Sequence, residues 1–181
     1  DVKVTPSSYQ ENGPPIWLAG WVPAGLRRAA RMGDGWIADP IQSLEVIKDY
    51  ADQYRVEAKK QGRKPFVVLM RDCVIGKDWE SCLRKSDPTM ATHRWYFHYG
   101  AYVQDDHIKE LKEPSDLTFE IAAKDRLIAG NPDQCLEQLL KWKSEVKPDY
   151  LMLRMRQPGG PPQEEALEDI RMFGESVIKN L

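Results

Sequence analysis

Residues 14–37, PPIWLAGWVPAGLRRAARMGDGWI, decide the fold of this chain. Residues 16–18 form a short apolar run that ends in a small-residue turn. Pro23 then stands where the first turn of a helix tolerates a residue without an N–H. Gly33 closes that helix before a second strand begins at residues 36–38. The order of strand, tight turn, helix, tight turn and strand is typical of a parallel α/β barrel or sheet, although any βαβ unit gives the same spacing.

The residue types in this stretch resemble the late barrel segment of the luciferase-like flavin-dependent monooxygenases. The shared order is Pro-Pro-Ile-Trp, a small residue with glycine, Pro-Ala-Gly, Arg-Ala-Ala-Arg and Gly-Asp-Gly-Trp. Residues 129–136 (AGNPDQCL) resemble the start of the family's penultimate helix, and residues 149–154 (DYLMLR) resemble its last barrel strand. The superfamily includes bacterial luciferase, the alkanesulfonate monooxygenases and deazaflavin-dependent oxidoreductases.

The length of the chain implies part of a barrel. A closed barrel of eight strand–helix units needs about 250 residues, and this chain has 181. Strand candidates lie at residues 16–18, 36–38, 66–75 and 150–155. The resemblance implies that these are the last four strands. We therefore expect an α/β fold, the carboxyl-terminal half of a (β/α)8 TIM barrel, with residues 1–181 forming a single partial barrel domain.

Residues 77–127 interrupt the strand–helix rhythm and are expected to form a largely helical insertion, because the segment is too long for an ordinary connection. The segment is rich in aromatic residues, and we interpret it as a mobile lid over the barrel mouth. Its histidines His93 and His98 do not indicate a metal site, because a spacing of five does not bring both rings to one face of a helix. No metal is expected. Before the insertion, Ser43 is expected to cap a helix that runs to about Lys60.

The composition is typical of a soluble intracellular domain. The chain is 41% hydrophobic and 30% charged, with a net charge of −2, which favours neither nucleic acid nor membrane as a partner. Three cysteines without a CxxC pair argue against a disulfide framework and favour a reducing compartment, so we expect a cytoplasmic protein.

The beginning of the chain supports the idea of a partial barrel. Asp1 is not preceded by an initiator methionine, and the sequence holds no apolar signal segment. We expect the carboxyl half of a longer protein, produced by proteolysis, prepared as a fragment or encoded separately. Such a half should pair with the missing amino-terminal half or with a second copy of itself, as a homo-oligomer.

The turn formed by Ala19, Gly20, Trp21 and Val22 is the candidate cofactor-binding segment. It places backbone N–H groups at a helix N-terminus, a geometry that suits a phosphate. In the family the corresponding turn commonly contacts the flavin phosphate, so the resemblance implies that these four residues bind FMN. The family often has serine or threonine after the glycine. Trp21 and Val22 remove that hydroxyl donor, and a plain packing turn is the alternative.

Arg71 is the candidate catalytic residue. It is a charge within an otherwise apolar strand, and a buried guanidinium needs a carboxylate, a ligand anion or water. It matches an arginine that the alkanesulfonate monooxygenases carry on this strand near flavin and substrate. The resemblance therefore implies that Arg71 points into the barrel. A structural ion pair with Asp39, Asp72 or another acid is the alternative.

Arg154 and Arg156 are candidates for binding an anionic substrate or phosphate. They lie two residues apart on the expected last strand, so we expect both side chains to point to the same side. A solvated strand end is the alternative.

The resemblance implies an oxidoreductase that uses reduced flavin (FMN) and oxygen to oxygenate a small organic substrate at the barrel mouth. One alternative is a deazaflavin-dependent enzyme that transfers hydride without oxygen. The other is a non-catalytic flavoprotein or subunit that keeps the scaffold. The half barrel alone is expected to be inactive, since the amino-terminal half normally carries most of the pocket and determines which substrate binds.

Overall fold

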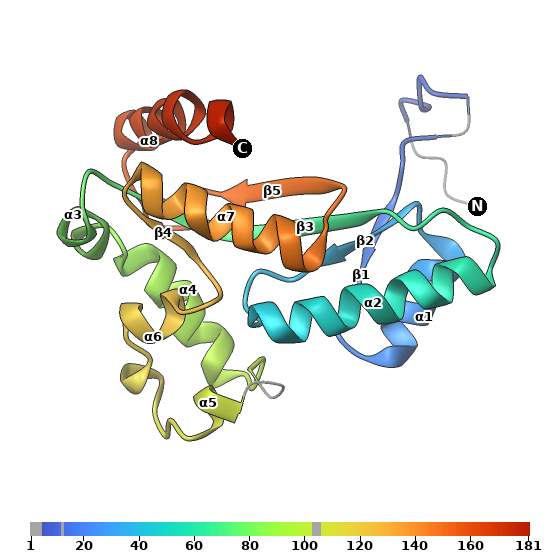
Figure 1. Cartoon of the computed structure of the whole chain (residues 1–181), viewed down its shortest axis with the longest axis horizontal. Helices are drawn as coiled ribbons and strands as arrows, with labels where there is room; N and C mark the ends of the chain where they lie inside the picture. Colours follow the sequence, from blue (N-terminus) through green and yellow to red (C-terminus); the bar gives the residue numbers. More distant parts are fainter. Residues whose placement is uncertain (1–4, 12, 103–105) are drawn as a thin grey trace.

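The computed structural model describes residues 5–11, 13–102 and 106–181. Its centre is a sheet of parallel strands (Figure 1). Within the described residues the strands are β1 (Trp17–Ala19), β2 (Gly35–Ala38), β3 (Val67–Ile75), β4 (Ile128–Gly130) and β5 (Tyr150–Arg154). β1 pairs with β2, β2 with β3, and β3 with both β4 and β5. The long strand β3 is therefore the element to which the rest of the sheet attaches.

The sheet is curved, as a segment of a barrel must be. The rings of Trp17 on β1 and Tyr150 on β5 lie with centroids 5.3 Å apart, although β2 and β3 separate their strands. Neighbouring strands are about 4.8 Å apart, so side chains from strands three positions apart meet across a concave face. The expected α/β half barrel is confirmed.

Helices cover the convex face of the sheet. The helices are α1 (Pro23–Met32), α2 (Leu44–Lys60), α7 (Pro132–Val146) and α8 (Gln163–Ser176), followed by a 3-10 turn η2 (Ile178–Asn180). Figure 1 shows α2 and α7 side by side in front of the sheet. The main core lies between sheet and helices and includes Trp36, Ile47, Leu69 and Trp142. Helix α1 contributes the buried residues Leu26, Ala29 and Ala30, whereas Met32 at its end is exposed.

The strand β4 is absent from the sequence prediction. The sequence pattern places residues 129–130 in the turn that opens α7, whereas the structure pairs Ile128–Gly130 with the last three residues of β3. A strand of three residues is too short to show a period of two.

The start of α2 also differs from expectation. Ser43 occupies the N-cap position of α2, but its side chain makes no capping hydrogen bond.

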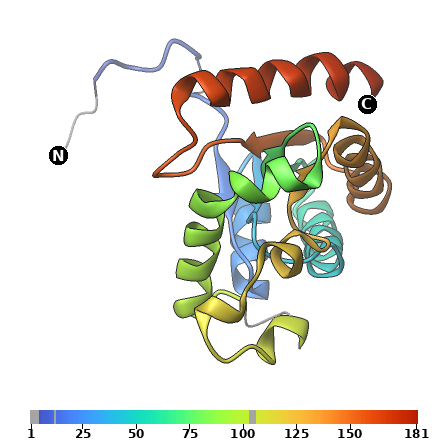
Figure 2. The same cartoon turned by 90° about the vertical axis from the view of Figure 1, so that its left-hand side faces the viewer.

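The insertion forms a group of helices at the carboxyl end of β3 (Figure 2). Its elements are α3 (Trp79–Arg84), α4 (Asp87–His98), α5 (Asp106–Lys109), η1 (Pro114–Asp116) and α6 (Phe119–Ala123). Met90, Leu117 and Phe119 are buried in a second apolar cluster that also contains Ile41 and Val74 from the barrel. The insertion therefore packs on the barrel through a core of its own.

Gly20 should not tolerate a side chain. A Cβ there would lie 2.8 Å from the Cα of Gly25, where β1 meets α1. We expect Gly20→Ala to lower the free energy of unfolding by about 2 kcal/mol, because backbone must move to make room. A Cβ added at Gly174, inside α8, would meet no atom within 4 Å, so Gly174→Ala should be neutral or stabilise by about 0.5 kcal/mol. Urea denaturation of both variants checks this, and equal effects would contradict the close approach.

Candidate active site

The turn of residues 19–22 joins the carboxyl end of β1 to the start of α1. Trp36 Nε1 donates a hydrogen bond to the Gly20 carbonyl oxygen at 2.9 Å, which fixes the turn over β2. Val22 is the N-cap residue of α1, and Pro23 follows it in the first turn. No side chain caps this helix. Pro23 has no N–H, and the Gly25 and Leu26 N–H groups donate to the Val22 carbonyl oxygen, so in this first turn the Ala24 N–H is the backbone donor suited to an anion.

A pocket of about 410 Å³ lies beside this turn. It is lined by Trp21, Val22, Gln42, Trp95, Tyr96, Tyr99, Gly100 and Ala101. The structure thus brings two of the four predicted cofactor-binding residues together with the aromatic residues of α4 in the insertion. This is the arrangement expected of a barrel mouth covered by an aromatic segment. We call it the mouth pocket.

A buried polar network centred on Asp72 attaches the insertion to the sheet. Asp72 Oδ1 accepts hydrogen bonds from Arg154 Nε at 2.6 Å and from Gln157 Nε2 at 2.7 Å. Its Oδ2 interacts with Arg154 Nη2 and His93 Nε2, both at 2.8 Å. The other ring nitrogen of His93 is hydrogen-bonded to the Tyr102 hydroxyl. We call these five residues the Asp72 network.

The electrostatics of the network favour a charged carboxylate. Burial alone would raise the pKa of Asp72, but hydrogen bonds from His93 and Arg154 outweigh it and hold the pKa below 3.8. Burial would lower the pKa of Arg154, yet its bonds to Asp72, with a contribution from the Tyr96 hydroxyl, raise it. Burial raises the pKa of Tyr102. Tyr96 also lines the mouth pocket, so the network reaches the edge of that pocket.

Arg154 and Arg156 do not act as a pair. The strand β5 ends at Arg154, so the alternation of a strand does not relate the two side chains. Arg154 is bound to Asp72 through two nitrogens. Arg156 Nε donates to the Pro161 carbonyl oxygen at 2.9 Å. Their role in binding an anion stays a prediction, and for Arg154 the charge is already neutralised.

Arg71 does not point into the barrel, which corrects that expectation. Its guanidinium carbon lies 3.9 Å from the ring centroid of Trp142 on α7, on the convex side. Arg71 is fully buried and donates from Nη1 to the Gln42 carbonyl oxygen at 3.0 Å. Its Nε and Nη2 have no hydrogen-bond partner among the described residues. Its catalytic role stays a prediction that this position does not support.

Substituting Arg71 should therefore stabilise the fold. Burial lowers the pKa of Arg71 to about 9, despite the opposing charge of Asp39. We expect Arg71→Met to raise the free energy of unfolding at neutral pH by about 1–2 kcal/mol, because a buried charge is replaced by an apolar chain. The Arg71 guanidinium binds its proton more tightly in the unfolded chain than in the fold. The free energy of unfolding of the wild type therefore rises as the pH exceeds 9, and the stability difference between the wild type and Arg71→Met should narrow there.

Chemical denaturation at neutral and alkaline pH measures this difference, with the exposed Arg28→Met as control. A strongly destabilised Arg71→Met variant would show that the guanidinium is well paired in the fold.

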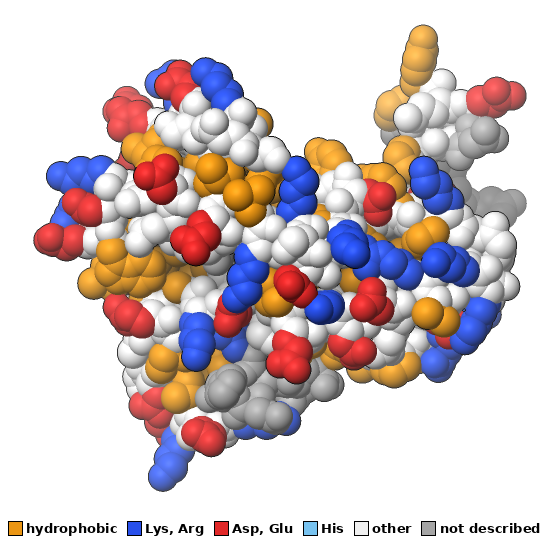
Figure 3. All heavy atoms as spheres, viewed as in Figure 1, with side chains coloured by type: hydrophobic (Ala, Val, Ile, Leu, Met, Phe, Trp, Pro, Cys, Tyr) orange, Lys and Arg blue, Asp and Glu red, His pale blue; other side chains and the backbone are white. Residues whose placement is uncertain are grey.

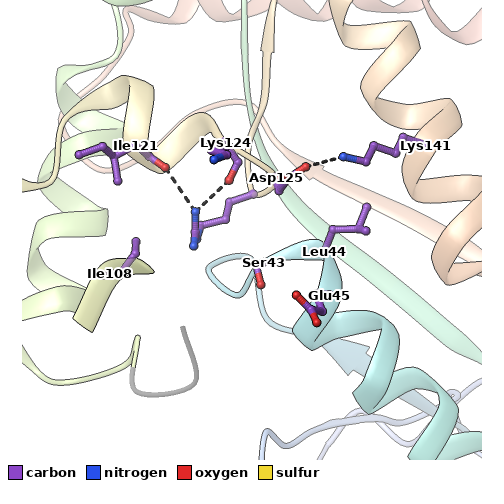
Figure 4. A pocket seen from close by; sticks show the side chains of 9 residues that line it. Ser43, Leu44, Glu45, Ile108, Ile121, Lys124, Asp125 and Lys141 are labelled. Atoms are coloured by element: carbon purple, nitrogen blue, oxygen red, sulfur yellow. Dashed lines mark hydrogen bonds and ion pairs between the residues drawn. The ribbon is translucent and has the colours of Figure 1, made fainter. Parts of the chain in front are cut away.

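A second, larger cavity of about 500 Å³ lies between the start of α2 and the end of the insertion (Figure 4). Its lining carries side chains of both charges, and two of its cations are already engaged. Lys141 Nζ pairs with Asp125 Oδ1 at 2.6 Å, and Arg126 Nη1 donates to the carbonyl oxygens of Ile121 and Lys124. We therefore place the candidate site at the mouth pocket.

His93, Tyr102 and Gln157 are functional candidates that the sequence does not reveal. His93 and Gln157 contact Asp72, and Tyr102 contacts His93. No local sequence motif links these residues to Asp72. The one available signal is strand alternation, which requires Arg71 and Asp72 to face opposite sides. It shows that one of the two faces the site without saying which.

The surface and the helices place few further constraints on function. Basic and acidic side chains are interspersed over the face that carries α2 and α7 (Figure 3). No helix in the described part of the chain has the length and apolar character needed to span a bilayer. Among the same residues, no three His, Cys, Asp or Glu side chains are grouped so as to hold a metal ion.

Comparison with protein families identifies the class. Residues 1–146 match the model of the luciferase-like monooxygenases. The chain therefore belongs to the luciferase-like monooxygenase family, and the resemblance described above is confirmed. A search of curated proteins found no match.

Solved structures agree on the fold. The monooxygenase RslO1 from Streptomyces bottropensis is 21% identical, with a TM-score of 0.69 over 97% of this chain and 50% of that chain. The coenzyme F420 dependent tetrahydromethanopterin reductase from Methanopyrus kandleri is 17% identical, with a TM-score of 0.61 over 91% of this chain and 50% of that chain.

A third structure is the oxygenating constituent of 3,6-diketocamphane monooxygenase from Pseudomonas putida in complex with FMN. It is 12% identical, with a TM-score of 0.68 over 93% of this chain and 49% of that chain. The chain thus spans about half the length of the structures it matches.

Proposed function

We propose that this chain supplies one side of the active site of an oxidoreductase that uses reduced FMN and oxygen to oxygenate a small organic substrate. The observation that carries the proposal is the mouth pocket, which joins the 19–22 turn to the aromatic residues of α4. In barrels of this kind the chemistry lies at the carboxyl ends of the strands. Family membership supports the same reaction class.

The residues present fit one part of a flavin. Ala19, Gly20, Trp21 and Val22 would bind the phosphate through backbone N–H groups at the start of α1, where no side-chain cap competes. Reduced flavin, when bound, supplies the electrons that activate oxygen. Trp95 and Tyr99 would exclude water from the mouth pocket, and the Asp72 network would hold α4 in place above it.

A deazaflavin enzyme is the second candidate. It is favoured by the F420-dependent reductase among the structural neighbours. A non-catalytic flavoprotein or subunit is the third, and it is motivated by the missing hydroxyl at Trp21.

Turnover of the complete barrel, in which this chain is joined to an amino-terminal half, separates the three functions. With reduced FMN and an organic substrate we expect oxygen uptake and an oxygenated product. Substrate-dependent hydride transfer with reduced F420 in the absence of oxygen would replace this proposal by the second candidate. Folded protein that binds flavin without turnover in either assay would favour the third.

A further inference from the structure

Helices α1 and α8 lie at the two ends of the outer helical layer. Along this layer α1 contacts α2, α2 contacts α7, and α7 contacts α8 (Figure 1). In a closed barrel the helices form a complete outer ring, so every helix has a neighbour on both sides. In the described part of the chain, one flank of α1 and one flank of α8 lack a neighbour in this layer. We call them the free flanks.

The free flank of α8 is apolar and open. Leu167 and Ile170 on α8 and Ile178 just after it are 42%, 50% and 51% exposed. With Gly174 they follow one another at spacings of three and four residues, so they share one side of the helix. Met172, which packs against the main core, lies on the other side. A Cβ added at Gly174 would meet no atom within 4 Å, so this flank has room for another helix.

The free flank of α1 carries Met32 and Arg28. Arg27 lines the groove between α1 and α2, and Met32, five residues later, lies about 140° further round the helix. Met32 is 62% exposed. Arg28 precedes Met32 by one turn and therefore lies on the same flank. This flank thus combines an exposed apolar side chain with a positive charge.

The two helices carry opposite charge. Helix α1 holds three arginines and no acidic residue, whereas α8 holds five acidic residues and one arginine. Two of these acids, Glu165 and Asp169, face Lys85 of the insertion at 3.9 and 2.6 Å. The other three are exposed, namely Glu164, Glu168 and Glu175. Glu164 lies one turn before Leu167, so acidic charge borders the apolar flank of α8.

We propose that two copies of this chain close one barrel, with α8 of each copy packed along α1 of the other. The strands β1, β2, β3 and β5 of one copy are then followed by the same strands of the second, so that β5 of each lies next to β1 of the other. This arrangement covers both open sheet edges and both free flanks, and the two-fold axis makes the same contact twice. Because the acidic and basic helices belong to one chain, a second copy is the partner whose charges fit. The proposal does not depend on the reaction.

Charge-reversal variants test the pairing by sedimentation equilibrium. The unaltered chain should reach a mass of twice 20.8 kDa. Arg28→Glu with Arg31→Glu, and separately Glu164→Lys with Glu168→Lys, should each raise the dimer dissociation constant at least about tenfold, because like charges then meet at both contacts. All four substitutions in one chain should restore the dimer to within about threefold, since the attraction returns with its signs exchanged.

Asp133→Lys with Glu137→Lys on α7 is the matched control. These acids are also four residues apart and exposed, but α7 has helices on both sides. The control should leave the dissociation constant unchanged, and circular dichroism should show every variant folded. A monomer at every concentration would overturn the proposal and leave both free flanks to an amino-terminal barrel half. A dimer that neither reversal weakens, or a folded four-residue variant that stays monomeric, would also overturn it.

Discussion

Asp72→Ala is expected to lower the free energy of unfolding by about 3 kcal/mol, because it leaves buried donors without their acceptor. Asp72 is fully buried and receives Arg154 and Gln157 from the end of β5 and the loop after it, and His93 from α4. Its loss should loosen α4 from β3 as well as weaken the whole fold. Urea denaturation gives the free energy, and hydrogen exchange of α4 amides gives the local effect.

The exposed pair of Glu80 and Arg84 on α3 provides the matched control. Its members are four residues apart and joined at 3.0 Å, with the Glu80 side chain 82% exposed. Glu80→Ala should therefore change stability by less than about 0.5 kcal/mol. Equal effects of Glu80→Ala and Asp72→Ala would show that the Asp72 network contributes nothing beyond a surface ion pair.

The same carboxylate predicts a pH dependence. The fold holds the pKa of Asp72 below 3.8, so its stabilising contribution is fully present above that value and is lost as the pH falls through the lower folded-state pKa. The stability difference between the wild type and Asp72→Asn should therefore be constant near neutral pH and shrink in acid. A difference that grows in acid would contradict this sign.

The isolated chain is expected to associate rather than remain a 20.8 kDa monomer. In the described part of the chain, β1 pairs with β2 alone and β5 with β3 alone, so each leaves one row of backbone groups unpaired. Ile16 and Tyr150, at these edges, are 57% and 49% exposed. Unpaired strand edges beside apolar surface recruit a partner.

Light scattering measures the mass, and hydrogen exchange of β1 and β5 shows whether their edges are covered. We expect a mass of at least twice that of the chain, or of the chain plus an amino-terminal half. A monodisperse monomer whose edge amides exchange freely would show that the half barrel is stable with open edges.

The parts of the fold that local chemistry determines are those that the sequence predicts. In residues 14–37 the turns and helix ends are marked by Gly20, Pro23 and Gly33. The predicted bounds of β1, α1 and β2 therefore agree with the structure to within one residue. The strand β4 is missed because its three residues show no period, and its place is set only by pairing with the end of β3.

The site is predicted less well, for the same reason. Trp21 and Val22 and the aromatic residues of the insertion are visible in the sequence, but their meeting in one pocket depends on how α4 packs. Asp72 lies next to Arg71, yet its partners Arg154 and Gln157 are 82 and 85 residues away. Strand alternation separates Arg71 from Asp72, and only the packing of α7 shows that the arginine takes the convex side.

The central claim is that this chain supplies one side of a flavin site. The most direct test is to titrate FMN against the chain alone and against the chain combined with an amino-terminal barrel half. Fluorescence quenching should show weak or no binding to the chain alone, because its donors for the phosphate are backbone groups at the start of α1. Tight binding should appear when both halves are present. Submicromolar affinity of the isolated chain, or no gain on adding the other half, would contradict a shared site.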